Sequence, residues 1–300
     1  MRAFIFDEYG YYPDQEDAVQ FEQDGWLFKL EIVQKQTEEE VHSLDTFVDQ
    51  LAGLFPNFGV RIIPNRNGAF VSETDFGKVA LVAIKKRYFS LQELAMIHHQ
   101  YLQPDPPEKF TITQLMELWE EKVNVIEEKA IPTIKIDDYA YERIMVATIH
   151  AIGLAENAIQ YLAELKIDYG NEIENLTLCH RRLSSLESEC VFNPFNFILD
   201  NAIRDLAELF KARKIPDDLF LENLSNYPLQ AKEAGLLFAR IVFPTYLFDL
   251  LETHYSDRMD VRSQILSYYR NLPEWMVTMQ KVERYFVEHY GIRPISWLQE

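Results

Sequence analysis

The sequence predicts an α+β fold, in which a small antiparallel sheet with one helix precedes a larger, mostly helical region. In the first 90 residues, apolar runs of strand length alternate with turn residues. Beyond residue 91 the apolar residues recur at helical spacing. The 300 residues are 48% hydrophobic and 13% aromatic, enough to bury one large core or two modest ones. We therefore predict an N-terminal α+β lobe over residues 1–90 and a helical C-terminal lobe over residues 91–300.

The N-terminal lobe is predicted to open with a β-hairpin. The apolar-rich runs Ala18–Glu22 and Trp26–Val33 flank Asp24-Gly25, a pair that favours the positive φ angles of a tight hairpin turn. A helix should follow, because Thr37 can cap its N-terminus and Glu40, three residues on, completes a capping box. The remaining strands are expected at Val60–Ile63, Ala69–Ser72 and Val79–Ile84, the last two joined by a turn that ends in Gly77.

A proline-rich linker is predicted early in the helical lobe. The cluster Pro104-Asp105-Pro106-Pro107 cannot continue a helix, so we expect a linker near residues 103–110. Apolar residues at helical spacing on either side of it predict helices at Leu91–Leu102, Thr113–Glu128, Tyr139–Leu165, Asp205–Ala212, Ala231–Leu251, Val261–Leu272 and Glu274–Tyr290.

The charge balance excludes two classes of partner. Lys and Arg total 29 against 48 Asp and Glu, a formal net charge of −19, which repels nucleic-acid phosphates and anionic lipid headgroups. We expect no nucleic-acid partner and no membrane insertion, since no stretch approaches the ~20 apolar residues that span a bilayer. Cys179 and Cys190 are too few for a disulfide framework. Without a signal-peptide pattern at Met1–Gly10, the protein is expected to be cytoplasmic when made.

The segment Leu176–Lys211 carries the most informative motif. It holds a strand-like approach to a histidine, Leu176–His180, and the helix signature Arg-Asp-Leu-Ala-Glu at Arg204–Glu208. These residues resemble the catalytic core of the aminoglycoside phosphotransferase and choline kinase family. In that family a strand delivers His-Gly-Asp, an Asn follows five residues after the Asp, a later strand carries a metal-binding Asp, and a helix with Asp-Leu-Ala comes next. With the predicted lobes, the resemblance implies a bilobal, protein-kinase-like fold.

The departures from this pattern fall on the residues that the chemistry needs. If His180 is the motif histidine, Arg182 occupies the position of the catalytic base. Glu187 then replaces the metal-binding Asn, and Asn193 replaces the second metal-binding Asp. An arginine stays protonated and offers only hydrogen-bond donors, so it can neither accept a proton nor hold Mg²⁺ on phosphates. The resemblance therefore implies a degenerate site without catalytic residues, bound metal or cofactor.

Two other interpretations of this segment stay open. A shift of a few residues in the alignment makes Glu187 or Glu189 the base and Asp200 the metal ligand. Alternatively, there is no relationship to kinases, and His180 is an ordinary histidine of a hydrophobic core.

Lys29 is the one candidate for nucleotide binding in the N-terminal lobe. It lies on a predicted strand, where a kinase lysine meets ATP phosphates, and glutamates at 38–40 lie on the next predicted helix. A strand lysine that faces solvent is the commoner explanation, so Lys29 is a cofactor-binding candidate only if a nucleotide binds. The triplet Asp75-Phe76-Gly77 lies far upstream of His180, so we predict a hairpin turn there rather than a metal-binding motif.

Two further segments, Gly153–Tyr161 and Leu236–Pro244, resemble the endospore coat-associated, YutH-type branch of this superfamily. The resemblance covers roughly residues 110–300. It implies a non-catalytic binding or assembly protein associated with the spore coat, with other spore coat proteins as partners; a homo-oligomer is compatible with it. The alternatives are a small-molecule phosphotransferase that uses displaced carboxylates, and a pseudoenzyme that binds a nucleotide or metabolite as a regulator.

Overall fold

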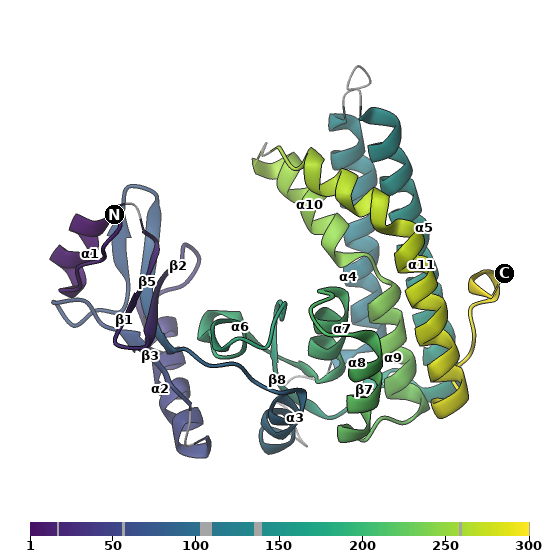
Figure 1. Ribbon diagram of the computed structural model, residues 1–300, viewed down its shortest axis with the longest axis horizontal. Coiled ribbons are helices and arrows are strands. Elements are labelled where there is room, and N and C mark those ends of the chain that lie inside the picture. Colours follow the sequence, from purple (N-terminus) through teal and green to yellow (C-terminus); the bar gives the residue numbers. More distant parts are fainter. Residues whose placement is uncertain (17, 56–57, 103–109, 135–139, 258–259, 300) are drawn as a thin grey trace. The chain divides into compact units, whose positions relative to one another are not determined.

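The computed structural model describes residues 1–16, 18–55, 58–102, 110–134, 140–257 and 260–299. The chain forms two compact units, one of residues 1–101 with 178–199 and one of residues 102–177 with 200–300 (Figure 1). The predicted proline-rich linker lies outside the described residues. The predicted division into lobes 1–90 and 91–300 stays a prediction.

The first unit is built on an antiparallel sheet. Its strands follow the order β1, β2, β5, β3, and β4 also pairs with β5. The bounds are β1 Gln20–Gln23, β2 Trp26–Ile32, β3 Val60–Ile63, β4 Ser72–Thr74 and β5 Gly77–Lys85.

Both predicted turns of this sheet are confirmed. Gln23 pairs with Trp26, and the two residues between them, Asp24 and Gly25, have φ angles of 52° and 78°. These are the angles that a two-residue turn of the primed type requires. In the second hairpin the strand partners are Thr74 and Gly77, and the φ of Gly77 is 124°, so Asp75-Phe76-Gly77 is a turn between β4 and β5.

Helices pack on both faces of the sheet. Helix α1 (Arg2–Tyr9), which sequence analysis did not predict, buries Ile5 and Tyr9 against Phe28 and Leu30 of β2. On the opposite face, Val41 of α2 (Glu38–Leu54) packs with residues of β3 and β5. The predicted capping box of α2 is confirmed: the hydroxyl of Thr37 accepts from the Glu40 N–H at 3.2 Å, and the Thr37 N–H donates to the Glu40 carboxylate at 2.7 Å.

Residues 178–199 belong to the first unit through contacts with the segment that leads into α3 (Leu91–Gln100). The backbone N–H of Phe89 donates to the carbonyl of Leu186 at 2.7 Å, and the N–H of Ser188 donates to the carbonyl of Arg87 at 2.9 Å. The ring of Phe192 lies 4.7 Å from that of Phe89. The chain enters this segment along β8 (Leu176–His180), passes through α6 (Ser188–Val191) and leaves along β9 (Phe197–Asn201), which pairs with β8.

The second unit is mostly helical. Short strands β6 and β7 pair beside its first helix, and a π-helical turn at Ile126–Ala130 extends α4. Helices α5 and α9 approach so closely that a Cβ on Gly235 would lie 2.6 Å from the side chain of Leu165, which explains the glycine there. The bounds are β6 Phe110–Thr111, α4 Ile112–Val125, α5 Tyr141–Tyr169, β7 Glu172–Ile173, α7 Ile203–Lys211, α8 Asp217–Asn223, α9 Ala231–Val242, α10 Thr245–Asp257 and α11 Arg262–Tyr290.

Two predicted helix boundaries were wrong. The helix predicted over Ala231–Leu251 is broken at Phe243-Pro244 into α9 and α10. The helices predicted on either side of Pro273 are one continuous helix, α11, with that proline inside it. Pro273 is exposed, so water can satisfy the carbonyl that loses its helical partner, whereas Pro244 is buried and the chain becomes extended before it.

One stretch of the described residues, Ala231–His254, is long and apolar enough to cross a membrane, contrary to the sequence-based expectation. Within its apolar window, 78% is buried inside the protein. Core helices meet the same criteria of length and composition, so this stretch is weak evidence for a membrane segment.

Candidate functional site

His180 is the last residue of β8 and is fully buried. Its Nε2 lies 2.7 Å from the carbonyl oxygen of Val191, which can only accept, so Nε2 carries the proton of this hydrogen bond. The imidazole also meets the ring of Phe197 edge to face, at 5.6 Å between centroids. These contacts join the end of β8 to α6 and β9, and they give His180 a structural role within the first unit.

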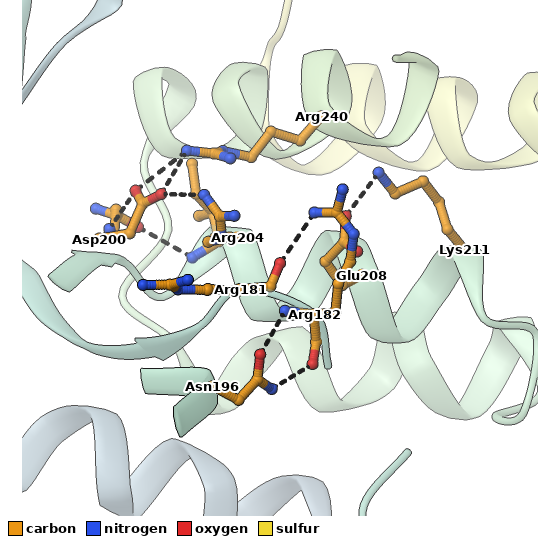
Figure 2. A network of polar contacts seen from close by, with 10 residues as sticks. Arg181, Arg182, Asn196, Asp200, Arg204, Glu208, Lys211 and Arg240 are labelled. Carbon is orange, nitrogen blue, oxygen red and sulfur yellow. Dashed lines mark hydrogen bonds and ion pairs between the residues drawn. The ribbon is translucent and has the colours of Figure 1, made fainter. Parts of the chain in front are cut away.

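The loop after His180 is held by an asparagine that sequence analysis missed (Figure 2). The side-chain oxygen of Asn196 accepts from the N–H of Arg182 at 3.1 Å, and its amide nitrogen donates to the carbonyl of Arg182 at 2.6 Å. The backbone carbonyl of Asn196 accepts from the N–H of Arg181 at 2.8 Å. The backbone at the predicted base position is therefore fixed, and the side chain it presents there is an arginine.

Glu187 and Asn193 both have local structural roles. Glu187 precedes α6, and its carboxylate accepts from the hydroxyl of Ser185 at 3.2 Å. Asn193 caps a 3-10 turn by accepting from the N–H of Phe195 at 3.1 Å. Its amide nitrogen donates to Glu31 of β2 at 2.7 Å, so Asn193 also ties this segment to the sheet.

The two alignments left open for the second metal-binding Asp use residues at different places before α7. The strand that leads into α7 is β9, and its acidic residue is Asp200. Asn193 lies before the strand, in the 3-10 turn. The resemblance implies an Asp that is carried by a strand. Asp200 lies on such a strand and Asn193 does not, and both alignments stay predictions.

Asp200 is buried, and two arginines of the second unit bind its carboxylate (Figure 2). Nη2 of Arg240, on α9, donates to both carboxylate oxygens at 3.1 and 3.0 Å. Nη1 of Arg204, on α7, donates to Oδ2 at 3.0 Å. The Asn201 N–H donates to Oδ1 at 2.7 Å. The negative charge of Asp200 is therefore already matched by two guanidinium groups.

The same network acts on the pKa of Arg204. Burial by itself disfavours the charged guanidinium, but the attraction and hydrogen bond of Asp200, with smaller contributions from Glu208 and Asp205, raise the pKa of Arg204 above its ordinary value. Arg204 therefore keeps its charge at physiological pH. A divalent cation at Asp200 would have to displace the two arginines and bear their repulsion.

Lys29 does not pair with the glutamates of α2. Its Nζ lies 2.8 Å from Glu31, two residues along the same strand, and Glu31 is the residue that Asn193 also contacts. In α2, Glu38 accepts from the backbone N–H groups of Phe70 and Val71 at 2.7 and 2.9 Å, and Glu40 completes the capping box.

Two members of this constellation, Arg240 and Asn196, were not predicted from the sequence, for different reasons. Arg240 lies within the apolar run Leu236–Phe243, and a lone arginine in such a run is the available signal of a buried ion pair. Asn196 has no comparable signal in the sequence, because its role depends on a loop geometry that brings it beside Arg182, 14 positions earlier.

Comparison with known proteins identifies the fold. The structure is similar to the crystal structure of an aminoglycoside phosphotransferase from Alicyclobacillus acidocaldarius, with a TM-score of 0.52 and 11% identity over 92% of this chain and 94% of that one. It is also similar to spectinomycin phosphotransferase APH(9)-Ia in complex with ADP and spectinomycin, with a TM-score of 0.54 and 10% identity over 94% and 97% of the two chains. The predicted kinase-like α+β fold is confirmed.

Sequence comparison identifies the family. The endospore coat-associated protein YutH of Bacillus subtilis is 29% identical over 158 residues, which cover 48% of this chain and 44% of that relative, so less than half of the relative's length is matched. The profile described as "Spore coat putative kinase YutH" matches residues 2–289. The chain therefore belongs to the YutH family of spore coat proteins with a kinase-like fold.

Proposed function

We propose that this protein is a catalytically inactive member of the kinase-like fold that serves as a binding or assembly component of the spore coat. The observation that carries the proposal is that the carboxylate of Asp200 is already paired with two arginines. The carboxylate of β9 that could hold a metal ion is bound by Arg204 and Arg240.

Catalysis of phosphoryl transfer would require chemical groups that the residues at the candidate positions do not supply. Phosphoryl transfer needs Mg²⁺ held by oxygen ligands and a carboxylate that orients and deprotonates the acceptor hydroxyl. At Asp200 the oxygens face two cations, and at the predicted base position stands Arg182. Loss of a general base lowers the rate by ~10²-fold to 10⁴-fold, and loss of metal-assisted charge stabilisation lowers it further.

The first unit gives independent support. In a kinase the lysine that binds ATP phosphates pairs with a glutamate of the following helix, whereas Lys29 pairs with Glu31 of its own strand. Phe195, two residues after Asn193, packs against the same sheet face as α2. A segment of the chain therefore lies on this face of the sheet, held there by the bond from Asn193 to Glu31.

The spore coat role rests on the relative rather than on any residue. The name of the Bacillus subtilis protein describes it as coat-associated, and membership of the same family supports the same location for this chain. We propose that it is made in the cytoplasm and joins the coat through other coat proteins.

Thermal unfolding with ATP tests the loss of catalysis. A ligand that binds only the folded state raises the melting temperature. We expect no rise with ATP, with or without Mg²⁺, and no phosphate release in the presence of aminoglycosides or choline; an active aminoglycoside phosphotransferase is the positive control. A Mg²⁺-dependent rise with turnover would instead establish a phosphotransferase, and a rise without turnover a nucleotide-binding regulator.

Fractionation of spores tests the proposed location. With an antibody against the protein, we expect signal in the coat extract of purified spores and in the cytosol of the cell that assembles the coat. Signal confined to the spore core would contradict the proposal.

A further inference from the structure

Two arginines of the second unit are exposed without an acidic partner, at the place where the start of α5 meets the first turns of α11. Arg143 of α5 and Arg270 of α11 line one hollow of about 630 Å³. None of the described residues forms an ion pair with either side chain. Arg262 lines the same hollow but pairs with Asp260 at 2.7 Å. The hollow therefore holds two unmatched positive charges, in a chain whose net charge is −19.

Apolar side chains continue this surface along α5. Val146 and Ile149 follow Arg143 at intervals of three residues, so all three share one side of the helix. Val146 and Ile149 are 51% and 59% exposed. On α11, Leu266 and Tyr269 line the hollow as well. Apolar side chains with arginines at their edge are the composition of a protein–protein interface.

The outer side of α4 carries the opposite charge. Glu117 and Glu121 are four residues apart and share one side of this helix with Leu118. Both glutamates are exposed, and within the part of the chain that the structure describes neither forms an ion pair. Leu118 is 53% exposed. This side of α4 is therefore an apolar side chain with two unmatched acidic groups.

We name these surfaces by their helices. The α5 face consists of Arg143, Val146 and Ile149 with Arg270 of α11, and the α4 face consists of Glu117, Leu118 and Glu121.

The two faces cannot bind each other within one chain. Helix α4 packs on α5 in the second unit, and it turns Leu115, Trp119 and Val123 to the interior, while its acidic face is exposed to solvent. The α5 face is exposed as well. Complementary faces that both point outward can meet only between two molecules.

We propose that the α5 face of one copy of this chain binds the α4 face of a second copy. The guanidinium groups of the α5 face pair with the carboxylates of the α4 face, and Leu118 packs against Val146 and Ile149. Two chains of net charge −19 repel each other at long range, so we expect a dissociation constant in the micromolar range. The proposal goes beyond the proposed function, because it holds whether or not the protein catalyses a reaction.

Analytical ultracentrifugation of the full chain tests the self-association. From low to high micromolar concentration, the average mass should rise reversibly above that of the monomer. A monomer throughout this range would overturn the proposal.

A charge swap locates the two faces. Arg143→Glu with Arg270→Glu makes the α5 face acidic, and Glu117→Arg with Glu121→Arg makes the α4 face basic. Each double variant alone should associate at least about tenfold more weakly than the unmodified protein, because like charges then meet. An equimolar mixture of the two variants should associate again, since the acidic α5 face of one meets the basic α4 face of the other. Undiminished association of either variant alone, or no association in the mixture, would overturn the assignment.

A control variant separates these pairs from the effect of net charge. Lys214→Glu with Arg284→Glu changes two exposed cations outside both faces and alters the net charge by as much as the α5-face variant does. It should associate as the unmodified protein does. A loss as large as that of the α5-face variant would show general repulsion instead of a specific contact, and would overturn the proposal.

Discussion

Both carboxylate oxygens of Asp200 accept a hydrogen bond from Nη2 of Arg240, at 3.1 and 3.0 Å. The two side chains are 4% and 8% exposed, so water does not screen the pair. With Arg204 on the other side, the carboxylate of Asp200 joins the end of β9 to α7 and α9. Asp200 therefore acts as a buried link between the end of β9 and two helices.

Replacing Asp200 by Asn should cost about 3–5 kcal/mol of the free energy of unfolding, because it removes the carboxylate that pairs with the buried guanidinium of Arg240 and with Arg204. Urea denaturation followed by circular dichroism measures the loss. The control is Asp217→Asn, which removes one of two acidic partners of Arg213, an arginine whose side chain is 36% exposed, and should cost about 0–1 kcal/mol. Equal losses in the two variants would show that the Asp200 network is not a buried ion pair.

Replacing Arg182 by Asp should not produce a kinase. The change restores a carboxylate at the predicted base position, but Asp200 remains bound by its two arginines and no metal is held. We expect phosphate release from Mg²⁺·ATP to stay at the level of buffer alone, in the same assay with aminoglycoside acceptors. Turnover by this variant would mean that the arginine at position 182 was the sole obstacle to catalysis.

The capping box of α2 should be measurable in the stability of the first unit. Thr37→Ala removes the side-chain acceptor of the Glu40 N–H and should cost ~1 kcal/mol. Thr46→Ala is the matched control, since Thr46 lies inside the same helix, where its hydroxyl bonds to the carbonyl of His42 and alanine is the better helix former. Chemical denaturation of both variants tests this. An equal effect of the two substitutions would contradict the capping assignment.

Glu283 should make stability depend on pH. Burial raises the pKa of this α11 carboxyl above its ordinary value of 4.5, and the hydrogen bond from the Ile295 N–H lowers it only in part. The folded protein therefore binds the proton more tightly than the unfolded chain does. This stabilisation is complete below pH 4.5 and is lost as pH rises through the raised pKa.

The variant Glu283→Gln has no carboxyl to ionise at this position. Its free energy of unfolding should therefore rise relative to that of the unmodified protein as pH rises from 4.5 towards neutrality. Urea unfolding at four pH values across this interval measures the difference. Glu288→Gln, at an exposed position of the same helix, is the control and should show no trend. A difference between Glu283→Gln and the unmodified protein that does not change with pH would refute the prediction.

Elements with a local chemical signal could be predicted from the sequence. Asp24-Gly25 fixes a turn through its own φ angles, and Thr37 with Glu40 fixes a helix start through two hydrogen bonds three residues apart. Helix α1 could not be predicted in this way, because it has neither a side-chain cap nor a long apolar face and is stabilised by packing against the sheet. The different behaviour of Pro244 and Pro273 likewise depends on burial, which is a property of the fold.

The candidate site could be predicted only in part. The position of Arg182 after β8 follows from the histidine motif. The pairing of Asp200 with Arg240 could not be predicted from the motif, because Arg240 lies 40 residues away in the sequence and reaches the carboxylate through the packing of α9. Spacing within the family indicates Asn193, and the structure places this residue before β9, which spacing alone could not predict because it does not define where a strand begins.

Water-proton relaxation of Mn²⁺·ATP solutions tests most directly whether the protein can hold a metal–nucleotide complex. Binding of the complex to a protein slows its tumbling and increases the relaxation rate of the surrounding water. We predict no increase up to millimolar protein, because the carboxylate of Asp200 is held by Arg204 and Arg240. An increase that the unmodified protein causes and the Asp200→Asn variant does not would contradict the account.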